Sequence, residues 1–298
     1  MVPPQHESKS MLTVGEVRDA AQRFLEERGV ENARFVSEVL VSEVLGWDRL
    51  RVYLDFERPM SMPERDALRA WVRECAGGRP WQYVLGATDF YGHRIEVDPV
   101  ALIPRPETEL LVDRCLEAMK EIRPAHRLRA ADVGTGTGCI LVALASEAGH
   151  AEETQWIGID RSSAALGLAA RNIAGHGLAG VQLVQADLLG PVGQAALDVV
   201  VANLPYIPAG ELEHLPRSVR DHEPHLALDG GAEGLDLVFA LMEQSERALR
   251  PNGWLGMELG IHQAAAVRER LGQGPWDKIE TIRDYAGIER IVTAYRAC

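Results

Sequence analysis

The segment at residues 198–208, DVVVANLPYIP, constrains the fold more than any other part of the chain. Residues 199–201 are consecutive valines, and such a β-branched apolar run is typical of a strand buried on both faces of a parallel sheet. The run stops at residues 203–206, which read Asn-Leu-Pro-Tyr. Ligands of open α/β sheets bind at the carboxyl ends of the strands. The segment therefore predicts an α/β protein with a ligand site directly after this strand.

The side chains after this strand suit a reaction at a planar nitrogen. The lone pair of such a nitrogen is delocalised, so its N–H groups must be held by acceptors and its plane must be supported. Asn203 offers a side-chain oxygen, and the Leu204 carbonyl offers a second acceptor. The Tyr206 ring can stack on a flat group, and Pro205 fixes φ so that the loop is stiff. The alternative is a simple turn, in which Asn203 caps the chain and Tyr206 packs.

A strand–helix–strand pattern precedes this segment and contains a glycine-rich loop. Residues 130–133 (AADV) lead into residues 134–138 (GTGTG), and an apolar helix follows. Glycine lets the backbone approach a ligand closely, and the start of the helix offers free N–H groups. A dinucleotide-binding fingerprint competes for this loop, but its spacing is GxGxxG whereas the spacing here is GxGxG.

Acidic residues end the next two expected strands. Asp160 ends the strand at residues 155–160, and Asp187 ends the strand at residues 181–187. A carboxylate at the end of the second strand can accept both hydroxyls of a ribose, and one at the third can accept from an adenine amino group. Either acid could instead cap a helix. Together with the glycine loop and the Asn-Leu-Pro-Tyr sequence, they predict one nucleoside site with a reacting group beside it.

The part of the chain before residue 104 predicts a helical bundle followed by a hairpin. Residues 11–77 carry apolar positions at helical spacing, with N-cap residues at Thr13, Asn32 and Ser61. Residues 89–97 (DFYGHRIEV) carry aromatic and β-branched residues around a glycine, which indicates a hairpin. The expected domains are the helical bundle at residues 1–78, a hairpin linker at residues 79–103 and an α/β domain at residues 104–298.

The C-terminal part predicts how the sheet closes. A helix at residues 235–249 precedes a strand at residues 254–259, and a further helix follows at residues 262–271. Two strands, at residues 279–283 and 291–295, then follow without a helix between them. One strand must therefore run antiparallel in an otherwise parallel sheet. This arrangement is the methyltransferase variant of the doubly wound, Rossmann-like fold.

Composition narrows the classes of function. The formal net charge is −13, which argues against a protein that holds nucleic acid mainly through its phosphates. The four cysteines have no zinc-type spacing, so we expect reduced thiols and no metal site. Residues 1–10 lack the apolar core of a signal peptide, and no stretch approaches the ~20 apolar residues of a membrane span. These features predict a cytoplasmic protein.

From Arg79 onward the chain resembles the HemK/PrmC family, the protein-(glutamine-N5) methyltransferases that modify peptide chain release factors. The resemblance is carried by RPWQYVLGATDFYG, LIPRPETELLVD, DVGTGTGCI, NLPYIP, EPHLALDGGAEGLD, PNGWLGMELGIHQ and RDYAGIER. The family usually has Asn-Pro-Pro-Tyr, and here Leu204 replaces the first proline. The backbone carbonyl survives this replacement. Asn-Leu-Pro-Tyr is also the form found in ribosomal RNA adenine dimethylases.

The resemblance implies a class I methyltransferase fold with S-adenosyl-L-methionine as the methyl donor. The acceptor would be the glutamine of the Gly-Gly-Gln motif in class I release factors, with no membrane and no stable nucleic acid as partner. The residues implied for the cofactor are Gly134, Thr135, Gly136, Thr137, Gly138, Asp160, Asp187, Leu188 and Asn203, with residues 104–107 lining the same pocket. The residues implied for the acceptor are Asn203, Leu204, Pro205 and Tyr206, of which Asn203, Pro205 and Tyr206 would be catalytic.

Three other functions share parts of this pattern. An N-methyltransferase of nucleic-acid bases would use the same site, because the exocyclic amines of adenine and cytosine share the planar geometry. A glutamine of a ribosomal protein is another acceptor of the same chemistry. A non-catalytic nucleoside-binding protein would need the glycine loop but not the acceptor residues after the strand. Labelling from S-adenosylmethionine distinguishes these alternatives.

Overall fold

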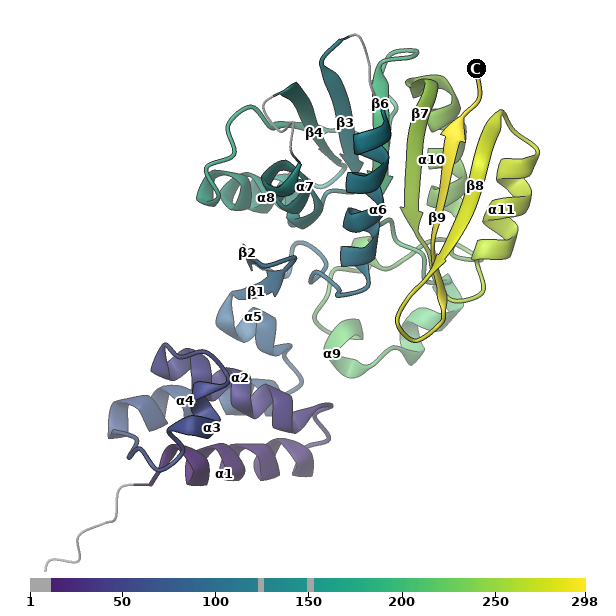
Figure 1. The fold of residues 1–298 in the computed structure, drawn as a ribbon. Coiled ribbons are helices and arrows are strands. Elements are labelled where there is room, and N and C mark those ends of the chain that lie inside the picture. Colours follow the sequence, from purple (N-terminus) through teal and green to yellow (C-terminus); the bar gives the residue numbers. More distant parts are fainter. Residues whose placement is uncertain (1–11, 123–125, 149–152) are drawn as a thin grey trace, which may run out of the picture. The chain divides into compact units, whose positions relative to one another are not determined.

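The computed structural model describes residues 12–122, 126–148 and 153–298. The chain divides into two compact units, Met1–Leu85 and Gly86–Cys298 (Figure 1). The first unit is helical, and the second contains both sheets.

The first unit is a bundle around one apolar core. Leu25, Leu40 and Val52 are completely buried in that core, which also contains Met60 and Leu68. Its helices are α1 (Val14–Glu27), α2 (Ala33–Leu45), α3 (Arg51–Leu54), α4 (Met62–Ala76) and α5 (Trp81–Leu85). The short helix α5 lies beyond residues 11–77, the stretch in which the sequence shows helical spacing.

Two of the three expected N-caps form as the sequence indicates. Thr13 with Glu16, and Ser61 with Glu64, make reciprocal capping boxes at the starts of α1 and α4. Asn32 occupies the N-cap position of α2, but its side chain makes no capping hydrogen bond. Its φ of 52° is left-handed, whereas a capping side chain requires an extended backbone. The prediction that Asn32 caps this helix is therefore wrong.

The second unit contains a two-stranded sheet and a seven-stranded sheet. The larger sheet has the order β5-β4-β3-β6-β7-β9-β8, and Figure 1 shows its twist. The strands are β1 (Ala87–Phe90), β2 (His93–Glu96), β3 (Leu128–Val133), β4 (Thr154–Asp160), β5 (Gln182–Gln185), β6 (Leu197–Ala202), β7 (Leu249–Glu258), β8 (Trp276–Arg283) and β9 (Glu289–Arg296). In the seven-stranded sheet, strand β9 is antiparallel to both β7 and β8, while the other strand pairs of that sheet are parallel. The expected antiparallel strand is confirmed, and it lies one place inside the edge strand β8.

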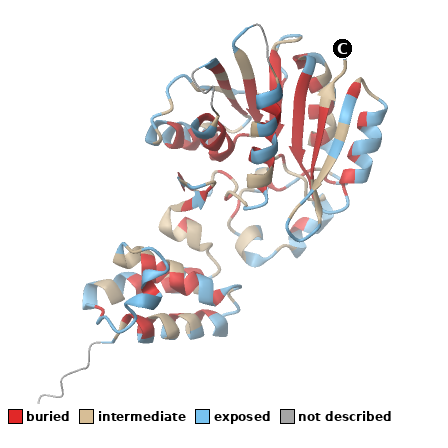
Figure 2. Cartoon of the chain, viewed as in Figure 1, coloured by how far each residue is buried: buried red, intermediate tan, exposed pale blue. Residues whose placement is uncertain are grey.

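Helices cover both faces of the large sheet. The helices of this unit are α6 (Thr108–Glu121), α7 (Cys139–Glu147), α8 (Ser163–Gly175), the 3-10 helix η2 (Ala209–His214), α9 (Arg217–Arg220), the 3-10 helix η3 (His225–Ala227), α10 (Asp236–Ala248) and α11 (Ala264–Gly272). In β6, Val199 and Val201 pack with α6, α7 and α8, whereas Val200 and Ala202 pack with α10 and α11. All of β6 is buried (Figure 2), which confirms the reading of the valine run.

The hairpin β1–β2 packs against the helices of the second unit. Phe90 and Ile95 enter the core that α6 and α7 share with the sheet. The Asn172 side chain of α8 accepts from Glu96 N at 2.7 Å and donates to the carbonyls of Glu96 and Thr137, each at 2.9 Å. The hairpin is thereby tied to the glycine loop that contains Thr137.

Two strand boundaries differ from the expected ones. Strand β5 ends at Gln185, so Asp187 lies in the turn that follows and not at the end of the strand. Strand β7 begins at Leu249, whereas the sequence predicts this strand only from residue 254. Its pairing with β6 is irregular there, because Leu197 pairs with Leu249 and Val199 with Trp254. Strand β7 therefore has three more residues than β6 between these two pairs, and an apolar pattern does not mark such polar residues as part of a strand.

Candidate active site

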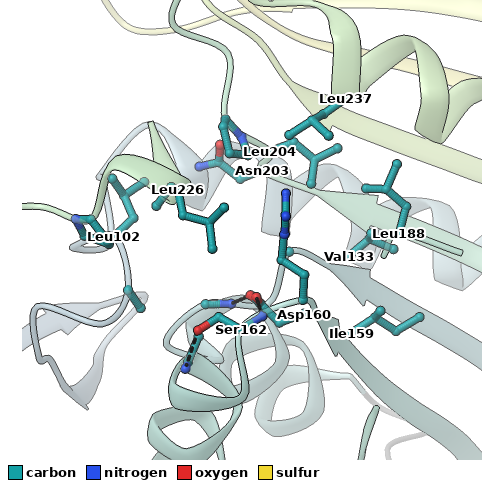
Figure 3. A pocket seen from close by; sticks show the side chains of 18 of the residues that line it. Leu102, Val133, Ile159, Asp160, Ser162, Leu188, Asn203, Leu204, Leu226 and Leu237 are labelled. Atoms are coloured by element: carbon teal, nitrogen blue, oxygen red, sulfur yellow. Dashed lines mark hydrogen bonds between the residues drawn. The ribbon is translucent and has the colours of Figure 1, made fainter. Parts of the chain in front are cut away.

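A pocket opens at the carboxyl ends of β3, β4 and β6. Its volume is about 260 Å³, and Figure 3 shows Asp160 and Ser162 across the cavity from Asn203 and Leu204. This is the edge at which open α/β sheets bind ligands. The residues that line it include Gly134, Gly136, Asp160, Asp187, Leu188 and Asn203.

The first half of the glycine loop forms one wall of the pocket. Gly134 N and Thr135 N donate to the Ile159 carbonyl at 2.8 and 3.0 Å, so the loop is fastened to the end of β4. Gly134 has a φ of 75°, and a Cβ atom there would lie 2.8 Å from Leu204 Cδ2. Glycine at this position therefore allows the residue after Asn203 to pack directly against the loop.

The other residues of the loop shape it from behind and do not line the pocket. Thr135 Oγ1 donates to Asp132 Oδ2 at 2.6 Å, and burial raises the pKa of Asp132 to about 7. Thr137 Oγ1 accepts from Cys139 N at 3.3 Å at the start of α7. Gly138 precedes this helix with a φ of 78°. The sequence grouped these residues with the ligand-binding ones because the motif is continuous along the chain.

Asp160 is held rigidly at the rim of β4. Its Oδ2 accepts from Gly136 N at 2.9 Å, and its Oδ1 accepts from Ser162 N at 2.8 Å. A carboxylate oxygen can accept more than one hydrogen bond, so both oxygens can also accept from a ligand. Asp187 lies exposed in the turn after β5 and lines the same pocket as Asp160. The two acids that the sequence singled out are thus brought together.

The remaining lining is mostly apolar. Leu188 belongs to the turn after β5 and is buried in the core, and Val133 and Ile159 also line the pocket. Leu102 and Leu226 lie on another side of the cavity in Figure 3. An apolar slot with carboxylates at its rim suits a planar base joined to a hydroxylated sugar.

Asn203 stands where β6 ends, and its amide is anchored through its nitrogen. Asn203 Nδ2 donates to Thr108 Oγ1 at 3.0 Å, and the Thr108 hydroxyl donates to Glu258 Oε2 at 2.6 Å. Within the part of the chain that the structure describes, neither Asn203 Oδ1 nor the Leu204 carbonyl accepts a hydrogen bond. Both acceptors therefore remain available to a ligand. Thr108 and Glu258 were not among the expected site residues.

Pro205 and Tyr206 differ in their placement. Pro205 lines the pocket with Asn203, whereas Tyr206 does not. The Tyr206 carbonyl accepts from Gln263 Nε2 at 2.8 Å, and a Cβ atom at Gly260 would lie 3.1 Å from the Tyr206 ring. Burial raises the pKa of the Tyr206 phenol to about 12, so the ring is neutral at physiological pH. Tyr206 thus places a flat, uncharged ring directly after Pro205 in the chain.

An ion pair joins two further loops beside the pocket. Arg105 Nη2 lies 2.5 Å from Glu223 Oε1, and Ile103 N donates to Glu223 Oε2 at 3.3 Å. The Glu223 side chain is almost completely buried. The residues after it, Pro224 and Leu226, line the pocket. Residues 104–107, which the resemblance implies as lining residues, are not part of the pocket wall, whereas residues 100–102 are. Arg105 links their loop to the segment around η3, a contact that no local pattern predicts.

Comparisons with known proteins place the chain in a family. Residues 16–86 match a family described as "PrmC N-terminal domain", and residues 126–266 match one described as "Methyltransferase domain". A release factor glutamine methyltransferase of Geobacter sulfurreducens is 40% identical over 96% of this chain and 98% of its own length. Proteins of the same name from Gloeobacter violaceus and Chlorobaculum tepidum are 38% and 37% identical, covering 87% and 95% of this chain and 89% and 97% of their own lengths.

Solved structures agree on the fold. The hMettl16 catalytic domain has a TM-score of 0.54 at 17% identity and covers 78% of this chain and 82% of its own. A methyltransferase from Pyrococcus furiosus has a TM-score of 0.50, also at 17% identity, covering 68% and 89%. The fold and the site define an S-adenosyl-L-methionine-dependent methyltransferase. The chain belongs to the release factor glutamine methyltransferase family.

The pocket fits the cofactor of this class. Its rim carries two carboxylates for hydroxyl and amino groups, and its floor is an apolar slot for a base. Gly134 lets Leu204 close the wall where any Cβ atom would collide. In the described residues, no group of three or more His, Cys, Asp or Glu side chains is arranged to hold a metal ion. None of the described helices is both long and apolar enough to span a bilayer.

Proposed function

We propose that this methyltransferase modifies the side-chain amide nitrogen (N5) of the glutamine in the Gly-Gly-Gln motif of class I peptide chain release factors. The relatives named above carry release factor glutamine methylation in their names. The observation that carries the proposal is the pair of free acceptors, Asn203 Oδ1 and the Leu204 carbonyl, beside the pocket. A primary amide has two N–H groups, and two acceptors match them.

The proposed chemistry depends mainly on orientation. S-adenosyl-L-methionine supplies an electrophilic methyl group when it is bound. Asn203 and Leu204 hold the acceptor amide by its hydrogens, so that the nitrogen faces the pocket. Their oxygens also stabilise positive charge as it develops on that nitrogen. No base is required before transfer, because the nitrogen becomes acidic only after it gains the methyl group.

We assign the remaining site residues supporting roles in the same reaction. Asp160 would accept from the ribose hydroxyls, and Asp187 with Leu188 would surround the adenine. Pro205 would keep the acceptor loop stiff, and the Tyr206 ring would support the plane of the glutamine amide. The other residues proposed to shape the cofactor site are Gly134, Thr135, Gly136, Thr137 and Gly138.

A labelling experiment tests the proposal against its alternatives. The protein is incubated with methyl-labelled S-adenosylmethionine and, separately, with a release factor, with the same factor in which the motif glutamine is changed, and with total RNA. We expect label only in the unchanged release factor. Label in RNA would support a base methyltransferase, and label in the changed factor would assign a different acceptor.

The charge of −13 already disfavours stable nucleic-acid binding. We place the reaction in the cytoplasm, where release factors meet the ribosome.

We propose that the helical unit recognises the body of the release factor. Leu50 and Leu54 are one helical turn apart, and 66% and 70% of their surfaces are exposed. Phe56, a few residues further on, is also exposed. Exposed apolar side chains that gather in this way are typical of a protein-binding surface.

Changing both leucines to serine should lower kcat/KM for the intact release factor by about 30-fold, because each loses apolar contact worth on the order of 1 kcal/mol. Kd for S-adenosylhomocysteine should stay the same, since Leu50 and Leu54 belong to the other unit. A short Gly-Gly-Gln peptide is the control substrate, because it lacks the body of the release factor. Equal losses on peptide and intact factor would assign recognition elsewhere.

Leu204→Pro restores the sequence usual in the family and keeps the backbone carbonyl. We expect activity on the release factor to remain within a few-fold of the original, since the acceptor oxygen is unchanged. The buried Leu204 side chain packs on Gly134, so its loss should lower the melting temperature. Steady-state kinetics and thermal unfolding measure the two effects. Abolished turnover in a folded variant would show that the leucine side chain, and not the carbonyl, is what the reaction needs.

A further inference from the structure

Glu258 is a buried carboxylate that the proposed chemistry leaves unexplained. It ends β7, and only 2% of its surface is exposed. Among the described residues, no Lys, Arg or His nitrogen lies within ion-pair distance of it. Arg290, from the neighbouring strand β9, is engaged with Asp284 at 3.1 Å. Burying a carboxylate without a cation is costly, so its presence beside the acceptor residues points to a role in the reaction.

The hydrogen bonds of this carboxylate have only one possible direction while it is ionised. An ionised Glu258 has no hydrogen to give, so the Thr108 hydroxyl must donate its single hydrogen to Oε2 at 2.6 Å. The Thr108 oxygen can then only accept, and it accepts from Asn203 Nδ2 at 3.0 Å. The Asn203 nitrogen is thus turned toward Thr108 and its oxygen away from it.

We propose that Thr108 and Glu258 are positioning residues that hold the Asn203 amide with its oxygen toward the acceptor nitrogen. The inference rests on the proposed function, because it concerns how Asn203 meets the glutamine amide. The oxygen and nitrogen ends of an asparagine side chain have nearly the same shape, so packing alone does not choose between them. A reversed amide would present N–H donors to the N–H groups of the glutamine.

The same chain of hydrogen bonds also strengthens Asn203 as an acceptor. Hydrogen bonds in series polarise one another, so donation from Nδ2 toward a negative group raises the electron density on Oδ1. This matters most when the acceptor nitrogen becomes positive during transfer. The effect should therefore fall on kcat more than on KM.

Thr108→Val tests the inference, because valine keeps the shape of threonine and removes the hydroxyl. Thr108→Ser restores the hydroxyl and is the matched rescue variant. We expect kcat on the release factor to fall at least 10-fold in Thr108→Val and to recover most of that loss in Thr108→Ser. KM for the release factor and Kd for S-adenosylhomocysteine should change less than threefold. Because Thr108 is buried, kcat is expressed per molecule that binds S-adenosylhomocysteine, so a partly unfolded sample does not imitate the result.

Glu258→Gln provides a second measurement through pH. The pKa of Glu258 is raised to about 7, mainly by burial and also by the negative charge of Glu107 at the start of α6. Thr108, Arg290 and Asn203 each act to lower this pKa. Tyr206 and Cys139 also face this carboxylate, and both are neutral near pH 7 because their own pKa values are raised to about 12. Once Glu258 is protonated, the Thr108 hydroxyl no longer has to donate to it, so the Asn203 amide is no longer held in one orientation. We therefore expect kcat of the original protein to fall as pH drops through about 7. In Glu258→Gln this acid limb should disappear.

The outcomes separate this inference from the proposed function. Activity that survives in Asn203→Ala removes Asn203 from the reaction and overturns this inference, whereas label in RNA and not in the release factor overturns the proposed function. Loss in Asn203→Ala with kcat of Thr108→Val within twofold of the original overturns the positioning role alone. An acid limb that is the same in Glu258→Gln as in the original protein also overturns it. Loss in Thr108→Val, rescue in Thr108→Ser and a vanished acid limb support it.

Discussion

Replacing Asn203 with alanine should lower kcat for release factor methylation on the order of 10²-fold or more, with little change in cofactor affinity. The Asn203 oxygen is one of two free acceptors beside the pocket, and its hydrogen bond should strengthen as the acceptor nitrogen becomes positive. Only interactions that are stronger in the transition state raise kcat. Steady-state kinetics with the release factor measure the loss, and titration with S-adenosylhomocysteine measures the affinity.

Turnover per folded molecule, with stability measured by thermal unfolding, distinguishes this role from that of a turn residue. A turn asparagine would cost about 1 kcal/mol of stability when replaced and leave turnover per folded molecule nearly intact. Asn203 donates to Thr108, so some loss of stability is expected in either case. The two roles differ in turnover. A less stable variant that still methylates at the original rate would remove Asn203 from the acceptor site.

Asp160→Ala should raise Kd for S-adenosylhomocysteine by about 10- to 100-fold. The carboxylate would accept from two ribose hydroxyls, and leaving these donors without their partner costs roughly 1–3 kcal/mol in total. The change also removes the acceptor of Gly136 N and Ser162 N, so the rim of β4 becomes less ordered. Calorimetric titration at a temperature below the unfolding transition measures the affinity of the folded protein.

Asp284→Ala is the matched control for this loss of backbone hydrogen bonds. Asp284 also accepts from two backbone N–H groups, those of Ala286 and Ile288, each at 2.9 Å, and it does not line the pocket. We expect Asp284→Ala to lower stability without changing Kd. Equal affinity in the two variants would mean that Asp160 acts only through the shape of the loop and does not touch the cofactor.

Much of the fold was predictable because it depends on local patterns. The valine run of β6 has apolar residues on both faces, and only a strand between two helical layers buries both. The capping boxes at Thr13 and Ser61 are equally local, since each joins residues three positions apart. The patterns failed at Asn32, where a left-handed residue occupies the N-cap position, and at the start of β7, where the strand includes polar residues before residue 254.

The candidate site was predictable where each motif lies at the end of its own strand. Parallel strands meet at a common edge, so the glycine loop, Asp160 and Asn203 had to converge once β3, β4 and β6 were adjacent. The sequence did not show which residues of the glycine loop line the pocket and which support the loop. Gly134 and Gly136 face the pocket, whereas Thr135, Thr137 and Gly138 support the loop, and a continuous motif does not reveal which residues turn inward.

The sequence by itself determined the class of sheet and the place of Asn203 at the carboxyl end of its strand, because these follow from short-range periodicity and strand order. Only the tertiary structure decided which way Asn203 faces. Its amide is oriented by Thr108, 95 positions earlier, and Thr108 binds Glu258, 150 positions later. Hydrogen bonds act over about 3 Å, so they join whichever side chains the fold brings together. No spacing along the chain records such a contact.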